Sequence, residues 1–104
     1  MSTNSNVLRQ TVTVKIPHGL HLNPCTVLVR LAQKYSASIV ICKGEIRADA
    51  RRLLDLMTLG AGPGVQLELE ISGDDAAGAL EEFVQLFDGD FSAADAPAPP
   101  PSNS

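Results

Sequence analysis

Residues 65–71 alternate between apolar and polar side chains over seven positions without a break, and no other feature restricts the fold of this chain as strongly. Successive side chains of a β-strand point to opposite faces of a sheet, so the pattern predicts a strand with one buried and one solvated face. Residues 11–16 alternate in the same way and predict the first strand. A sheet made from such strands exposes one face to water, and the helices must therefore all cover the other face.

Two further segments extend this predicted sheet and begin to cover it. The β-branched run 38–42, the turn residues 43–45 and the short segment 46–48 together predict a hairpin. Between the first strand and this hairpin, apolar residues recur at helical spacing from position 23 onward. They predict a helix whose apolar face consists of Val27, Leu28, Leu31, Ala32 and Tyr35.

The second half of the chain predicts two more helices. A short helix is expected near residues 51–59, with Asp49 as its N-cap and an apolar face of Leu53, Leu54, Leu56 and Met57. The glycine-rich segment 60–64 ends this helix. The last helix is expected to bury Ala76, Leu80, Phe83, Val84 and Phe87. The element order βαββαβα, with one wet sheet face, predicts an α+β fold of the open-faced α/β sandwich type.

Length, charge and cysteine content limit what this protein can be. Its 104 residues suit one domain, which we place at residues 9–90, with disordered segments at 1–8 and in the proline-rich stretch 91–104. A net charge of −4 without a cluster of Lys and Arg argues against nucleic acid as a partner. No apolar run is long enough to cross a membrane, and Cys25 and Cys42 suit buried positions in a reducing compartment. We therefore expect a cytoplasmic protein without membrane insertion.

The segment 17–25, which reads Pro-His-Gly-Leu-His-Leu-Asn-Pro-Cys, contains the main candidate functional residue. His21 lies at or just before the N-cap of the predicted helix 23 onward, where unpaired backbone N–H groups and the positive end of the helix dipole attract an anion. Gly19 can adopt a positive φ and turn the chain sharply, and Pro24 suits a first helical turn. A histidine placed in this way can accept and hold a phosphoryl group.

This segment resembles the active-site pattern of the histidine-containing phosphocarrier protein family, HPr, of the bacterial phosphotransferase system. The family pattern is Gly, an aliphatic residue, His, a small residue, Arg, Pro and Ala, and the glycine, histidine and proline are matched by Gly19, His21 and Pro24. Asn23 stands where the family has arginine. A second family signature is a Lys-Ser pair that opens a short helix ending near Met-Thr-Leu-Gly. It resembles residues 51–60, in which Arg52 replaces the regulatory serine.

The resemblance, which spans residues 10–87, implies a four-stranded antiparallel sheet covered by three helices on one face. It implies that His21 receives a phosphoryl group from an enzyme I-like donor and passes it to a sugar-specific phosphotransferase component. Gly19, Asn23, Pro24 and the backbone of Cys25 would support the phosphate. The protein would then be a monomeric carrier without a cofactor rather than an autonomous enzyme, and Arg52 would leave it without kinase regulation at that position.

Two alternatives remain open at this point. One is an interaction module of the same fold whose phosphotransfer is impaired by Asn23 and whose docking patch consists of Leu20, Leu22, Leu53, Leu54 and Met57, although core packing is the simpler interpretation of Leu53 and Met57. The other is a small metal-binding protein, because His18, His21 and Cys25 have an H-x2-H-x3-C spacing. The metal hypothesis has no evident fourth ligand, and we expect no metal site.

Overall fold

The computed structural model describes residues 7–17 and 19–89 of the chain. Its elements, in chain order, are β1 (Val7–Thr13), α1 (Leu22–Gln33), β2 (Ser38–Lys43), β3 (Ile46–Asp49), α2 (Leu53–Met57), β4 (Gln66–Ser72) and α3 (Ala76–Asp88). The predicted order βαββαβα is confirmed.

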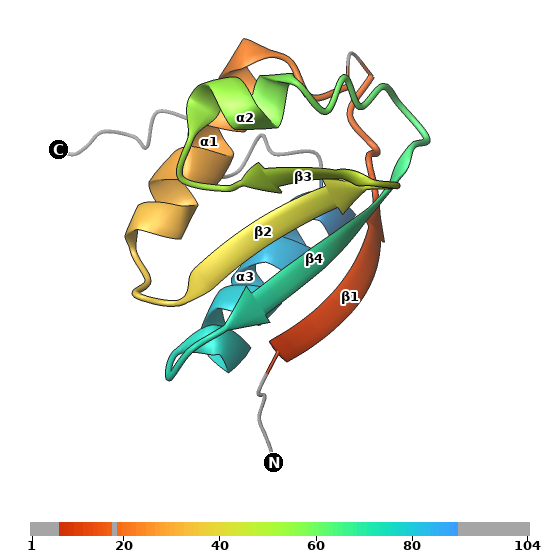
Figure 1. Ribbon diagram of the computed structural model, residues 1–104. Coiled ribbons are helices and arrows are strands. Elements are labelled where there is room, and N and C mark those ends of the chain that lie inside the picture. Colours follow the sequence, from red (N-terminus) through yellow and green to blue (C-terminus); the bar gives the residue numbers. More distant parts are fainter. Residues whose placement is uncertain (1–6, 18, 90–104) are drawn as a thin grey trace, which may run out of the picture.

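All strands belong to one antiparallel sheet with the order β1-β4-β2-β3. β4 is central, and its alternation is visible in the structure, because Leu67, Leu69 and Ile71 are buried while the residues between them are only half-buried. In Figure 1, α1 and α3 lie behind the sheet and α2 lies above β3. Within residues 7–17 and 19–89, no helix covers the other sheet face, as the alternating sequences predicted, and the fold is an open-faced α/β sandwich.

The uncovered face of the sheet carries charged side chains that pair across strands. Glu70 on β4 lies between two arginines, with its carboxylate 2.9 Å from Nη1 of Arg47 on β3 and 3.7 Å from Nε of Arg9 on β1. Cys42 also belongs to this face and is nearly inaccessible, with its sulfur 3.7 Å from Arg47 Nη1. Both cysteines are buried and free, as the sequence predicted.

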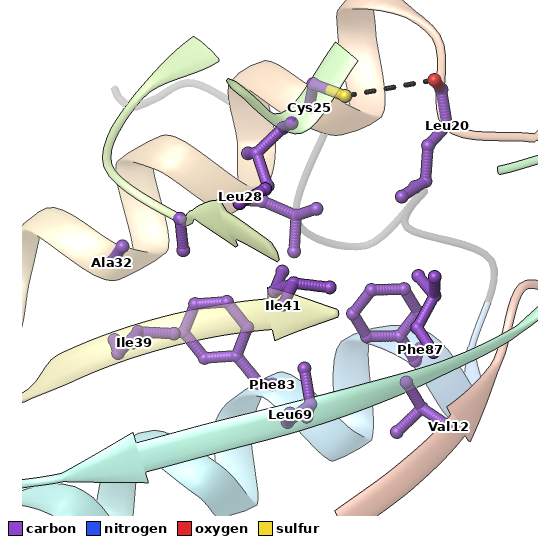
Figure 2. Close-up of a cluster of buried hydrophobic side chains, with 14 of the residues drawn as sticks. Val12, Leu20, Cys25, Leu28, Ala32, Ile39, Ile41, Leu69, Phe83 and Phe87 are labelled. Carbon is purple, nitrogen blue, oxygen red and sulfur yellow. Dashed lines mark hydrogen bonds between the residues drawn. The ribbon is translucent and has the colours of Figure 1, made fainter. Parts of the chain in front are cut away.

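The core lies between the sheet and its helices and is mostly aliphatic. Phe83 and Phe87 of α3 are fully buried and point toward Ile39, Ile41 and Leu69 of the sheet, as Figure 2 shows. Leu28 and Ala32 of α1 complete the layer. Burial of each large apolar side chain contributes about 1.5–3 kcal/mol, so this layer fixes α1 on the sheet.

The first strand begins earlier than the alternating pattern predicted. Val7 and Leu8 pair with Ser72 and Ile71 of β4, so the expected disorder of residues 1–8 is wrong for these two residues. Backbone hydrogen bonding between the two segments continues beyond the end of β1. The Val14 N–H donates to Val65 O at 2.9 Å, and the Gly64 N–H donates to Val14 O at 2.8 Å. The remainder of the expected terminal disorder, at residues 1–6 and in the proline-rich stretch, falls outside the described residues.

The short helix differs most from the sequence prediction. Arg52, not Asp49, is the N-cap of α2, and Asp49 Oδ1 instead accepts the N–H of Arg51 at 2.9 Å in the preceding turn. Of the predicted apolar face of this helix, only Leu56 is fully buried. In α3 the buried positions include Ala79, while Leu80 and Val84 are only partly buried, because the helix turns its 76–79–83–87 stripe toward the sheet.

Within residues 7–17 and 19–89, no helix combines the length and apolarity that crossing a lipid bilayer requires.

Candidate functional site

The N-terminus of α1 forms the candidate site, and His21 is its N-cap, as predicted. His21 is exposed and has an extended backbone, with φ −99° and ψ −163°. Its carbonyl accepts the N–H of Cys25 at 3.1 Å, which closes the first helical turn, and its own N–H donates to Gly19 O at 3.0 Å. The imidazole of His21 is therefore attached at the residue where α1 begins.

The first turn of α1 presents two backbone donors next to this histidine. The N–H groups of Leu22 and Asn23 find no acceptor in the described part of the chain, and Pro24 has no N–H. The first turn contains no acidic residue that would neutralise the positive end of the helix. An oxyanion beside His21 can therefore accept hydrogen bonds from both N–H groups and gain from the helix dipole.

The loop that carries His21 is held against the segment after α2. Gly19 has φ +72°, and a Cβ at this position would lie 2.5 Å from Ala61 O and 2.8 Å from Gly62 Cα. The next residue, Leu20, donates its N–H to Ala61 O at 2.8 Å. Glycine is required at position 19 both for the positive φ and for this close approach. Sequence reasoning identified the turn but treated residues 60–64 only as a helix terminator, since nothing in their spacing shows which loop they contact.

Leu20 and Cys25 are buried beneath His21. Leu20 is 7% exposed, so its predicted place in an exposed docking patch is wrong; its side chain anchors the loop in the core instead. The Cys25 thiol is fully buried and lies 3.8 Å from Leu20 O, as Figure 2 shows. Burial raises the pKa of Cys25 to about 11, so at neutral pH it remains a thiol and is not the thiolate that metals bind.

The described residues give no support to the alternative of a metal site. His18 falls outside them, and they contain no cluster of three or more His, Cys, Asp or Glu residues able to hold a metal ion. Cys25 points into the core, where a protonated thiol is a weak ligand. The hypothesis of a site made from His18, His21 and Cys25 thus gains no support from the position of Cys25.

Only some of the side chains in the predicted docking patch are exposed. Leu22, Leu54 and Met57 are exposed by 51%, 76% and 42%, and we call these three residues the apolar rim. Leu53 is half-buried and packs against the core, as core packing predicted. α2 lies against α1 at the top of Figure 1, so the rim residues belong to the helix that His21 caps and to its neighbour. Arg52 is exposed at the N-cap of α2.

Comparison with known proteins agrees with the fold. Residues 8–88 match the family described as "PTS HPr component phosphorylation site". The open-faced sandwich fold and this family match together identify the class of protein as a phosphocarrier of the phosphotransferase system. The chain belongs to the HPr family.

Individual relatives support the same assignment. The chain is 32% identical over 82 residues to phosphocarrier protein HPr of Treponema pallidum, covering 79% of this chain and 93% of the relative. It is 37% identical over 84 residues to phosphocarrier protein NPr of Shewanella violacea, covering 81% of this chain and 92% of the relative. Among solved structures, HPr-C-His from Thermoanaerobacter tengcongensis has a TM-score of 0.78 at 29% identity, covering 82% of this chain and 96% of that one. The expected four-stranded antiparallel sheet with three helices is confirmed.

Proposed function

We propose that this protein carries a phosphoryl group on His21, which it accepts from an enzyme I-like phosphorylated donor and passes to a sugar-specific phosphotransferase component. One observation carries the proposal: His21 is the exposed N-cap of α1, next to the N–H groups of Leu22 and Asn23, for which the described residues provide no acceptor. In this proposal the carrier acts in the cytoplasm as a monomer, forms one domain that extends from β1 to α3, and uses no cofactor. The apolar rim and Arg52 form the surface on which its partners dock.

The chemistry requires a neutral imidazole. The lone pair of a ring nitrogen of His21 attacks phosphorus, a new N–P bond forms, and the N–P bond of the donor phosphohistidine breaks so that its electron pair returns to the donor ring. The transferring oxygens remain negative throughout, and the first-turn N–H groups of α1 stabilise them without reorganisation. The second transfer is the same step with His21 as the leaving group.

Asn23 limits how strongly this site can stabilise a phosphoryl group. The family arginine would add a charge-assisted hydrogen bond to the phosphoryl oxygens, whereas an exposed Asn23 offers a neutral amide. This substitution favours a second candidate function, an interaction module in which phosphotransfer has become inefficient. Gly19, Pro24 and the Cys25 backbone support the phosphate only by shaping the loop and the first turn.

Phosphorylation with phosphoenolpyruvate and enzyme I tests the proposal. We expect one phosphoryl group per chain that is labile in acid and stable in base, as phosphohistidine is. His21→Ala abolishes the label. His18→Ala is the matched control, because the chain has two histidines, and it retains the label. Full labelling of His21→Ala would assign the carrier role to another residue.

A further inference from the structure

Lys43 is a charged residue on the core face of the sheet. Side chains alternate along β2, so Lys43 lies on the same face as Ile39 and Ile41, both of which are buried. It is half-buried at the last position of the strand. An ammonium group on this face needs hydrogen-bond acceptors, because burial without them is costly.

The acceptors of Lys43 are backbone carbonyls just beyond α2. Its Nζ donates to Leu59 O at 3.0 Å and lies 3.5 Å from Gly60 O. Among the described residues no carboxylate forms a salt bridge with Lys43, so these two carbonyls are its recorded partners. Both carbonyls follow the C-cap Thr58, so the lysine pairs with the backbone of the loop after α2 and not with the helix itself.

The segment that Lys43 holds is also the one that supports the histidine loop. Residue 61 directly follows the Gly60 carbonyl, and Ala61 O accepts the N–H of Leu20, the residue before His21. Gly19 packs on Ala61 and Gly62 without room for a side chain. Lys43 is therefore linked to His21 through residues 59–61 and Leu20.

We propose that Lys43 is a positioning residue for His21. It acts by fixing the carbonyls of Leu59 and Gly60, which holds Ala61 where it must accept the Leu20 N–H and thereby sets the place of His21 relative to the first-turn donors of α1. The proposal rests on the proposed function for its kinetic consequence, but its structural part is independent of phosphotransfer.

The test compares three variants with the wild-type protein by amide hydrogen exchange and by the rate of phosphotransfer. Lys43→Met removes the ammonium group and keeps an unbranched apolar stem. Lys43→Arg keeps a cationic donor. Lys34→Met is the matched control, because Lys34 is exposed at the far end of α1 and pairs with Glu82.

In Lys43→Met we expect the Leu20 amide to exchange about tenfold faster, because local opening of the loop becomes easier while the core amides of β2 and β4 stay protected. Phosphotransfer to His21 should fall about tenfold, because small displacements of a reacting group lower the rate strongly. Lys43→Arg should recover most of both effects. Lys34→Met should match the wild type.

Several results would overturn the inference. Unchanged Leu20 exchange in Lys43→Met breaks the proposed link, and faster exchange without loss of phosphotransfer shows that His21 does not depend on it. Faster exchange at all core amides shows a general stabilising role. If the wild type accepts no phosphoryl group, the proposed function fails separately. In that case faster Leu20 exchange with shifted NMR resonances of the His21 ring still supports the positioning role, and unchanged values overturn it.

Discussion

Gly19 and Gly44 both have a positive φ, +72° and +58°, but only Gly19 lies against another segment of the chain. A Cβ at position 19 would lie 2.5 Å from Ala61 O, whereas a Cβ at position 44 meets nothing within 4 Å. The pair of substitutions Gly19→Ala and Gly44→Ala therefore separates backbone strain from the contact between the two loops.

The expected magnitudes follow from these geometries. Alanine in the left-handed region costs about 1–2 kcal/mol, and Gly44→Ala should lose this much and no more. Gly19→Ala carries the same strain and must also displace backbone atoms of Ala61 and Gly62, which adds about 1–3 kcal/mol of overpacking. The total of about 2–5 kcal/mol is below the stability of most domains of this size, so the variant should still fold.

Urea unfolding measures these free energies, and phosphotransfer from enzyme I measures the effect on the site. We expect Gly19→Ala to lose at least about tenfold in phosphotransfer, since separating the loops moves His21, while Gly44→Ala transfers at the wild-type rate. Equal destabilisation by the two substitutions would refute the reasoning, because it would show that the close approach of Gly19 to Ala61 contributes nothing.

Two further predictions concern residues on either side of Pro24. Asn23→Arg should speed phosphotransfer about tenfold, because a charge-assisted hydrogen bond is worth about 1.5 kcal/mol more than a neutral one; an unchanged or slower rate in stopped-time labelling would show that Asn23 suits a different partner. The pKa of Cys25 is raised from 9.0 to about 11, so the folded protein binds this proton more tightly than the unfolded chain. The resulting stability is present below pH 9 and is lost as the pH rises toward 11. Urea unfolding between pH 8 and pH 11 should show a decline that is shallower in Cys25→Ala, and parallel curves would contradict the assignment.

The sequence predicted those parts of the fold and site that depend on local patterns. Alternation identified β4, and the combination of Gly19, His21 and Pro24 placed His21 at the start of α1, because turn and capping preferences act within a few residues. The β2–β3 hairpin was found for the same reason.

Features that depend on distant contacts could not be predicted in this way. Leu20 and Leu22 flank His21 and have the same side chain, yet one is buried and the other is half exposed. Burial of Leu20 depends on Ala61, forty-one positions later by residue number, and a loop has no period that would reveal it. Similarly, Asp49 is a good N-cap residue by type, but it is used in the turn with Arg51 and leaves the N-cap to Arg52.

The sheet order β1-β4-β2-β3 determines when the protein can fold during its synthesis. β1 emerges first from the ribosome but pairs only with β4, whose partner positions begin at Gln66 and end at Ser72. The loop of His21 likewise cannot form its hydrogen bond from Leu20 N–H until Ala61 has been synthesised. Since synthesis proceeds at about 5–20 residues per second, the histidine exists for several seconds before the segments that position it have been made. The site is therefore assembled late, although His21 is made before the segments that support it.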